Sequence, residues 1–169
     1  MPAPPLAADI PQVLQQKIIA RQQVVARDWA SMRPLVFTNG VFDLLHAGHV
    51  AYLAAARSLG QTLLVAVNTD ASARRLDKGP GRPLNDERDR ALVVAALESV
   101  SLVTWFDEDT PCELIARCRP DVYVKGGDYD IETLAETRLV RGWGGRSVAI
   151  PLLPGRSTSS LVQRIRGGD

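Results

Sequence analysis

Short apolar runs alternate with amphipathic stretches along the chain from Pro34 onward. Each run is continuous rather than alternating, which is typical of a strand buried on both faces of a sheet. The predicted strands are residues 35–38, 62–67, 102–106, 122–124 and 148–150. The predicted helices are residues 48–59, 86–98, 110–119, 132–141 and 157–166. Strands and helices in alternation build crossover units. We therefore expect an α/β fold: a Rossmann-like, doubly wound, parallel five-stranded sheet with helices on both faces.

Residue types also predict the connections between these elements. The pair Asn39-Gly40 predicts a turn after the first strand. Residues 70–83 are polar and interrupted by glycine and proline, which predicts a long loop. Thr110, with Glu113 three residues later, is the expected N-cap of the helix that Pro120 ends.

The N-terminal stretch differs from the rest of the chain. Residues 1–11 are rich in proline and alanine and are expected to be frayed. Residues 13–29 carry apolar side chains near helical spacing and predict one amphipathic helix, which covers the core or forms a dimer contact. We therefore divide the chain into an N-terminal tail and helix, residues 1–33, and one functional domain, residues 34–169.

Composition excludes several classes of protein. The chain has 169 residues, of which 46% are hydrophobic and 23% charged, as in an ordinary globular domain. A net charge of +1 argues against a protein that neutralises many phosphates of a long nucleic acid. No apolar run reaches the roughly 18 residues of a membrane span. Cys112 and Cys118 lie on different faces of a predicted helix, so they cannot easily pair, which fits a reducing cytoplasm.

The chain's two histidines, His46 and His49, both lie just after the first predicted strand. At this spacing on the first turn of a helix, both rings can face one side. Gly48 between them lets another group approach the backbone closely. A helix N-terminus already attracts anions, so two imidazoles there predict a polyphosphate pocket. The alternatives are a capping or packing role, or a zinc site with Asp43 as the one nearby carboxylate.

Other candidates also follow predicted strands, where ligands bind in open parallel sheets. Lys78, one of three lysines in the chain, lies in the loop after the second strand and is either a phosphate-binding residue or a solvated one. Arg88 either reaches a phosphate or pairs with a nearby acid on the surface. Gly126 and Gly127 would let the backbone approach a base or phosphate, or form a simple turn. Ser157-Thr158 presents hydroxyls at the start of the last helix, as a cap and as an anion site.

Residues 40–49, Gly-Val-Phe-Asp-Leu-Leu-His-Ala-Gly-His, resemble the HxGH signature of the nucleotidyltransferase superfamily. With residues 81–85, 106–111, 124–129 and 155–160, they resemble the D-glycero-D-manno-heptose 1-phosphate adenylyltransferases. The resemblance spans residues 34 to 166 and identifies residues 34–169 as a nucleotidyltransferase domain. It implies transfer of AMP from ATP to the sugar 1-phosphate. The products would be pyrophosphate and ADP-heptose, the precursor of the lipopolysaccharide inner core.

The same resemblance implies a role for each matching residue. His46, His49 and Lys78 would act on the phosphates, and Lys125 and Arg88 would bind the sugar phosphate. The implied nucleotide-binding residues are Asn39, Gly40, Val41, Phe42, Asp43, Gly48, Gly126, Gly127, Asp128, Ser157 and Thr158. Mg²⁺ is expected to arrive with ATP, and no protein residue is assigned to it. A homodimer and a separate heptose kinase are the implied partners.

Several other enzyme classes lack their signatures in this sequence. Neither a P-loop pattern nor a dinucleotide fingerprint after the first strand is found. The readings that stay open are a glycerol-3-phosphate cytidylyltransferase, another small-molecule nucleotidyltransferase, and a non-catalytic nucleotide-binding protein.

Overall fold

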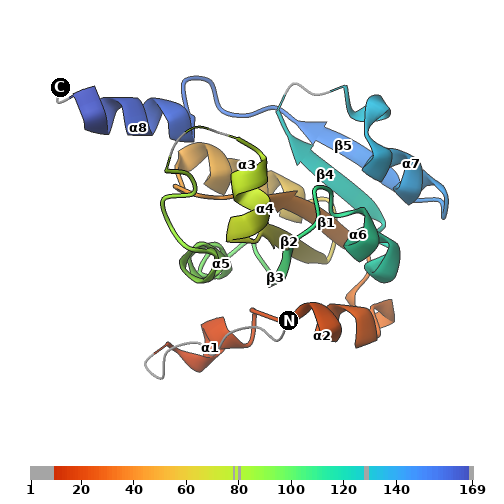
Figure 1. Ribbon diagram of the computed structural model, residues 1–169. Coiled ribbons are helices and arrows are strands. Elements are labelled where there is room, and N and C mark those ends of the chain that lie inside the picture. The colour runs from red at the N-terminus through yellow and green to blue at the C-terminus, as the bar shows by residue number, and fades with distance from the viewer. Residues whose placement is uncertain (1–9, 78, 80, 128–129, 168–169) are drawn as a thin grey trace.

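The computed structural model describes residues 10–77, 79, 81–127 and 130–167. Five parallel strands form one sheet in the order β3-β2-β1-β4-β5 (Figure 1). The strands are β1 (Leu35–Gly40), β2 (Thr62–Asn68), β3 (Leu102–Phe106), β4 (Val122–Gly126) and β5 (Arg146–Ile150). The chain builds outward from β1 to β3 and then returns to the other side of β1. This order confirms the predicted doubly wound sheet and places the switch point between β1 and β4.

Helices cover both faces of the sheet, as predicted, and alternate strand residues divide between two apolar clusters. One face packs against α3 (Ala47–Arg57) and α5 (Glu87–Ala95), with Val36 pointing to that side. The other face packs against α2 (Arg21–Ala26), α6 (Cys112–Cys118) and α7 (Ala135–Arg141), with Leu35 and Phe37 pointing there. The strands are continuous apolar runs because both of their faces are buried.

The prediction of a single helix over residues 13–29 is wrong. The structure has two short helices, α1 (Gln12–Gln15) and α2, followed by the 3-10 turn η1 (Ala30–Met32). Between α1 and α2 the chain forms a parallel bridge from Ile18 to Val103 of β3. Val103 donates its N–H to Lys17 O (2.7 Å), and the Ile19 N–H donates to Val103 O (2.9 Å). Pairing with this edge strand satisfies the backbone groups that a continuous helix would have satisfied internally.

The N-terminal segment nevertheless covers the core, which is one of the two roles expected for it. Ile19, Val24 and Trp29 are buried in the same cluster as the α6 side chains. The Trp29 indole N–H donates to Val24 O (3.1 Å) and holds the segment against the domain. The division between residues 33 and 34 stays a prediction.

Several predicted element ends are corrected by the structure. β1 runs through Asn39 and Gly40, which pair with β2 instead of forming a turn. Part of the predicted 70–83 loop forms α4 (Asp70–Arg75), capped by the Thr69 hydroxyl. The N-cap of α6 is Pro111 and has no side-chain cap bond, so the predicted Thr110 cap is wrong. The helix predicted over residues 132–141 divides into η2 (Ile131–Thr133) and α7.

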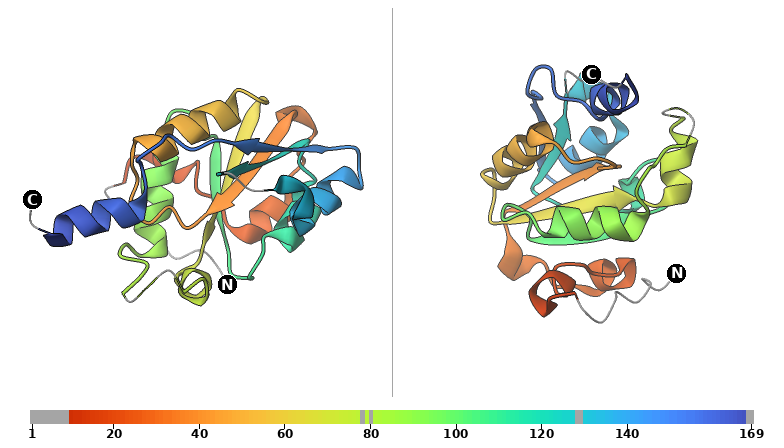
Figure 2. Two further views of the ribbon diagram at one scale, coloured as in Figure 1. Left: turned by 90° about the horizontal axis from the view of Figure 1, so that it is seen from above. Right: turned by 90° about the vertical axis from the view of Figure 1, so that its left-hand side faces the viewer.

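The last helix, α8 (Thr158–Gly167), extends away from the body of the domain (Figures 1 and 2). The Ser160 N–H donates to Ser157 Oγ (3.0 Å), so Ser157 is the capping residue. Within the described residues, α8 contributes no buried side chain. In the same part of the chain, no helix is long and apolar enough to cross a membrane. Cys112 and Cys118 are both free thiols, as predicted.

Candidate active site

A pocket of about 490 Å³ opens at the carboxyl ends of β1 and β4, beside the switch point of the sheet. Predicted site residues that line it are Asn39, Gly40, Val41, Phe42, Asp43, His46, His49, Lys125, Gly126, Ser157 and Thr158. Residues that the sequence reasoning did not assign to the site also line it, namely Tyr52, Arg82, Leu152, Arg156 and Ser159. The pocket therefore joins the ends of two strands to the starts of two helices.

The two histidine rings stack on each other at the start of α3. Their centroids lie 3.9 Å apart at an interplanar angle of 30°. His46 is the N-cap of α3, and its Nδ1 accepts the Gly48 N–H (3.1 Å). A neutral His46 therefore carries its proton on Nε2, which leaves an Nε2–H donor for a ligand. Burial lowers the pKa of His46 below its ordinary value, and the charge of Arg156 lowers it further.

Gly48 allows this close stacking against the helix start. A Cβ added at position 48 would lie 2.8 Å from His46 Nδ1 and 3.3 Å from Arg156 Cβ. The group nearest to position 48 is the His46 ring. Gly48 is not among the residues that line the pocket, and its predicted nucleotide contact stays a prediction. A side chain at this position would displace the ring.

Phe42 shapes the loop between β1 and α3. Its backbone is left-handed, with φ of 50°, which is uncommon for a residue with a side chain. The Phe42 ring lies over Gly40, where an added Cβ would be 3.0 Å from Phe42 Cε2, and meets His49 edge-on with centroids 5.6 Å apart. The loop is therefore folded tightly between the strand end and the histidines.

Asp43 holds this loop to the segment before α5. Its buried carboxylate accepts Arg82 Nε (2.6 Å), the Leu84 N–H (2.7 Å) and the Asn85 N–H (3.0 Å). Asn85 Nδ2 donates back to Asp43 O (2.7 Å). Asp43 therefore ties the loop between β1 and α3 to the segment before α5.

A buried arginine, Arg90, also supports the loop between β1 and α3. Its side chain is fully buried and donates to Val41 O (2.6 Å), Asn85 O (3.0 Å) and Asp70 Oδ1 (2.7 Å). A buried cation is tolerated only when it is paired and hydrogen-bonded, and here every nitrogen has an acceptor. The sequence reasoning did not identify Arg90, because its neighbours in the sequence are charged residues of the kind usually found on a protein surface.

Tyr52 of α3 forms part of the pocket between β1 and β4. Its hydroxyl shares a hydrogen bond with Thr38 Oγ1 (2.5 Å) and donates to Val124 O (3.2 Å). Burial raises the pKa of Tyr52 above its usual range, so it stays neutral. A Cβ at Gly126 would lie 3.1 Å from the Tyr52 ring and from Leu152 Cδ2, so glycine lets both side chains pack closely on the strand end.

The pocket is lined by cationic side chains that come from separate segments. Lys125 is near the end of β4, Arg156 precedes α8, and Arg82 precedes α5. Arg82 and Arg156 both lie in stretches that carry the family resemblance, yet neither was assigned a role. Arginines occur throughout this sequence, and the fold shows that these two face the pocket.

Not every predicted residue reaches the pocket. Arg88 is exposed on α5, and its backbone N–H donates to Asp86 Oδ1 (2.9 Å). It is not among the residues that line the pocket, so the predicted substrate contact is not supported. Gly127 has φ of 118° and donates its N–H to Ile150 O (3.0 Å), joining β4 to β5 beside the pocket. Lys78 and Asp128 lie outside the described residues.

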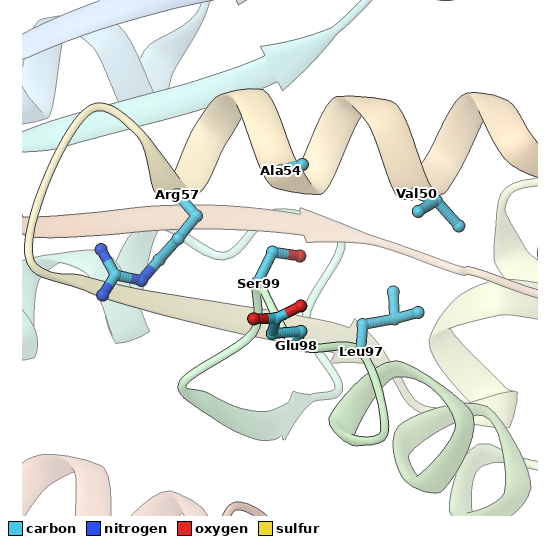
Figure 3. A pocket seen from close by; sticks show the side chains of 6 residues that line it. All are labelled: Val50, Ala54, Arg57, Leu97, Glu98 and Ser99. Atoms are coloured by element: carbon cyan, nitrogen blue, oxygen red, sulfur yellow. The ribbon is translucent and has the colours of Figure 1, made fainter.

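A second groove, of about 440 Å³, lies between α3 and the end of α5 (Figure 3). Val50 and Leu97 lie at one end, and Arg57 lies at the other. It contains neither histidine and does not lie at the carboxyl ends of the strands. We therefore assign the chemistry to the larger pocket.

A protein-family model described as cytidylyltransferase-like matches residues 37–162. The chain belongs to this cytidylyltransferase-like family. The matched range includes every residue that lines the pocket and all of the sheet except Leu35 and Val36 of β1.

Among curated members of the family, the D-beta-D-heptose 1-phosphate adenylyltransferase of Bordetella bronchiseptica is 60% identical over 156 residues. That match covers 91% of this chain and 96% of that protein. The bifunctional protein HldE of Magnetococcus marinus is 56% identical over 146 residues, which cover 86% of this chain and 30% of that protein. This chain thus spans nearly all of the first relative and less than a third of the second.

Two solved structures have a similar fold. The lipopolysaccharide core biosynthesis protein of Thermoplasma volcanium is 27% identical, with a TM-score of 0.59, over 70% of this chain and 95% of that one. The pantoate-beta-alanine ligase of Francisella tularensis has a TM-score of 0.56 at 13% identity, over 84% of this chain and 68% of that one. The second likeness concerns the fold alone.

Proposed function

We infer that this chain transfers the adenylyl group of ATP to a heptose 1-phosphate, which gives ADP-heptose for lipopolysaccharide core synthesis and releases pyrophosphate. The observation that carries this function is 60% identity to a heptose 1-phosphate adenylyltransferase over 96% of that enzyme's length. The pocket supports it, because cations and helix N-termini surround a histidine pair at the switch point.

The residues in the pocket fit a direct displacement at the α-phosphate. An oxygen of the sugar phosphate forms a bond to the α-phosphorus, while the bond from that phosphorus to the bridging oxygen breaks and pyrophosphate takes the electron pair. Negative charge grows on the phosphoryl oxygens during this step. His46 donates through Nε2–H, since its Nδ1 is occupied by the Gly48 N–H, and His49 stacks against it. Both act by positioning and charge stabilisation rather than as nucleophiles.

The nucleotide lies on the side of β4 and β5 in this proposal. Ser157 and Thr158 present the free N–H groups of α8, and Arg156 lies beside His46. Gly126 and the neighbouring Leu152 leave room for a flat base against the strand end. Gly127, Asp128 and Lys78 remain predicted contributors to the nucleotide and phosphate contacts.

Mg²⁺ is proposed to enter as part of the substrate, bound to the ATP phosphates. Asp43 is the carboxylate that lines the pocket, and both of its oxygens already accept hydrogen bonds from Arg82 and two backbone N–H groups. Among the described residues, no group of three or more His, Cys, Asp or Glu side chains is placed to hold a metal. We therefore propose that the metal is carried by the ATP phosphates and water, and we assign no protein residue to it.

The remaining partner assignments are also proposals. A kinase that phosphorylates the heptose must supply the substrate, and a cytoplasmic site of action would give access to ATP. A homodimer is expected from the family resemblance. The resemblance implies that Lys125 binds the sugar phosphate. Because Lys125 lies at the end of β4, on the nucleotide side in this proposal, we propose that it contacts the transferred phosphate instead.

Turnover with a substrate panel tests the function. Purified protein would be mixed with D-glycero-D-manno-heptose 1-phosphate or glycerol 3-phosphate, each with ATP, CTP or GTP, and pyrophosphate release would be measured. We expect release with heptose 1-phosphate and ATP to exceed every other pair. A preference for CTP with glycerol 3-phosphate would instead establish a cytidylyltransferase. Binding of ATP without release from any pair would indicate a non-catalytic nucleotide-binding protein.

A further inference from the structure

Arg82 reaches the pocket from a segment that follows β2, whereas the segments that carry Arg156 and Lys125 lie on the other side of β1 in the strand order. Arg82 lies between β2 and α5, whereas Lys125 is in β4 and Arg156 follows β5. In the sheet, β2 and β4 flank β1 on opposite sides, and the histidines follow β1. Positive charge thus lines the pocket on both sides of His46 and His49.

Among the described residues, the Arg82 side chain is held in place through its Nε. Nε donates to Asp43 Oδ2 (2.6 Å), and the Arg82 and Asp43 side chains are 13% and 2% exposed. Backbone N–H groups of Leu84 and Asn85 occupy the other oxygen of Asp43 and fix the carboxylate in turn. Within the described residues, the two terminal nitrogens of Arg82 have no hydrogen-bond partner. A guanidinium anchored at Nε still has a free edge with two parallel donors, which matches a phosphate.

The geometry of the displacement decides which phosphate that is. Incoming and leaving groups lie on opposite sides of the phosphorus that is attacked. The triphosphate is expected on the side of α8, because the N-terminus of α8, Arg156 and His46 all lie there. The attacking phosphate must then approach from the other side, which is the side of Arg82.

We propose that Arg82, positioned by Asp43, binds the 1-phosphate of the acceptor sugar and selects for a phosphorylated acceptor. This assignment rests on the proposed adenylyltransferase function. The acceptor phosphate keeps its own charge as it attacks, so no proton transfer is needed. Arg82 is a substrate-binding residue, and Asp43 is a positioning residue that acts through it.

Separate titrations of the two substrates test this assignment in Arg82→Gln, Arg82→Lys and Asp43→Asn. In Arg82→Gln we expect the KM for heptose 1-phosphate to rise roughly 10- to 100-fold, as for loss of a charge-assisted hydrogen-bonded contact. The dissociation constant of ATP, measured by equilibrium dialysis, should stay within about twofold. Arg82→Lys should rescue part of the loss, and Asp43→Asn should shift the same KM by a smaller factor. Arg117→Ala removes an exposed arginine on α6 as the matched control and should change neither constant.

The possible outcomes separate this assignment from the proposed function. If Arg82→Gln weakens ATP binding as much as it raises the KM for heptose 1-phosphate, Arg82 belongs to the nucleotide side and the assignment is wrong. If the unaltered protein releases no pyrophosphate with heptose 1-phosphate, the proposed function fails first and the assignment fails with it. Melting temperatures identify a variant that has lost its fold. If Arg82→Gln unfolds, the KM of Arg82→Lys for heptose 1-phosphate tests the assignment instead, because lysine keeps the charge beside Asp43. An unchanged KM in Arg82→Lys counts against the assignment.

Discussion

Two helices, α3 and α8, begin at the same pocket but are anchored very differently. Gly48, Tyr52, Leu53 and Ala56 of α3 are buried against the sheet. In contrast, α8 contributes no buried side chain within the described residues and extends from the domain (Figure 2). The start of α3 is therefore fixed by the core. The start of α8 is held by polar contacts to other segments, such as the hydrogen bond from Thr158 Oγ1 to Leu44 O (3.3 Å).

This difference suggests a division of labour between the two helix starts. A rigid donor is most valuable where charge develops in the transition state, since it needs no reorganisation at that moment. That place is the start of α3, which carries the histidines. A contact that serves mainly to bind the nucleotide can order when the nucleotide arrives. That role suits α8.

The largest effect is expected from removing the His46 ring. His46→Asn keeps a side chain that caps helices well but removes the Nε2–H donor. We expect turnover to fall by roughly 100- to 1000-fold, as on loss of a preorganised donor to a developing charge. His46→Ala should lose as much turnover and also about 1 kcal/mol of stability, because the cap is lost too. Steady-state kinetics and thermal melts of both variants would separate the two roles. Nearly full activity in His46→Asn would show that His46 is only a cap.

A smaller loss is expected from Gly48→Ala. The added Cβ would lie 2.8 Å from His46 Nδ1, so the ring must shift. We expect turnover to fall by about 10-fold, as on misplacement of a catalytic group. Stability should change little, because alanine favours the helix by about 1 kcal/mol over glycine and offsets part of the steric cost.

Gly167→Ala near the end of α8 is the matched control for Gly48→Ala. An added Cβ meets no described atom within 4 Å there. Its turnover and melting temperature should match those of the unaltered protein. If Gly48→Ala behaves in the same way, the close packing of His46 on Gly48 has no catalytic importance.

Matched cap deletions sharpen the comparison between anchored and projecting helices. Asp86→Ala removes the carboxylate that caps α5 through the Arg88 and Asp89 N–H groups. Because α5 is packed in the core, we expect a loss of about 1 kcal/mol, which lowers Tm by roughly 2–4 °C. Ser157→Ala should leave Tm unchanged but raise the KM for ATP by about 2- to 5-fold, as α8 frays at the pocket. An equal fall in Tm for both variants would show that α8 is part of the cooperative fold.

The smallest effect concerns pH and His46. Burial and Arg156 lower the pKa of His46 in the folded protein, so the unfolded chain takes up the proton first as pH falls. The stabilisation is complete above the ordinary histidine pKa of about 6.5 and is lost as pH falls from there through the folded value. His46→Asn cannot titrate. We therefore expect the Tm advantage of the unaltered protein over this variant to shrink between about pH 7 and pH 5. An advantage that grows on acidification would contradict the direction of the shift.

The sheet and the histidine pocket could be predicted from the sequence because their signals are local. Each strand is a continuous apolar run, and both histidines follow the central strand directly. By contrast, the break in the predicted N-terminal helix depends on Val103, some 80 residues away in the chain, which pairs with Ile18. Apolar spacing alone could not show that a tertiary partner competes for that backbone.

The pocket arginines show a second limit of sequence reasoning. Arg82 faces the pocket because Asp43 fixes it, and Arg90 is buried because three acceptors surround it. Arg88, two residues before Arg90, is exposed. Helical spacing and residue type do not distinguish these side chains. Only the contacts made by each guanidinium show which one lines the pocket, which one supports a loop and which one is solvated.

The short bridge between Ile18 and Val103 has a practical meaning for protein engineering. A strand at the rim of a sheet offers unpaired N–H and C=O groups to any other strand, and this is a common start of aggregation. Here residues 17–19 pair with the edge strand β3 at Val103. Removing residues 17–19 would expose the edge of β3 and make the shortened protein prone to aggregation. Affinity tags and fusion junctions should therefore be placed before residue 10, with residues 17–19 kept.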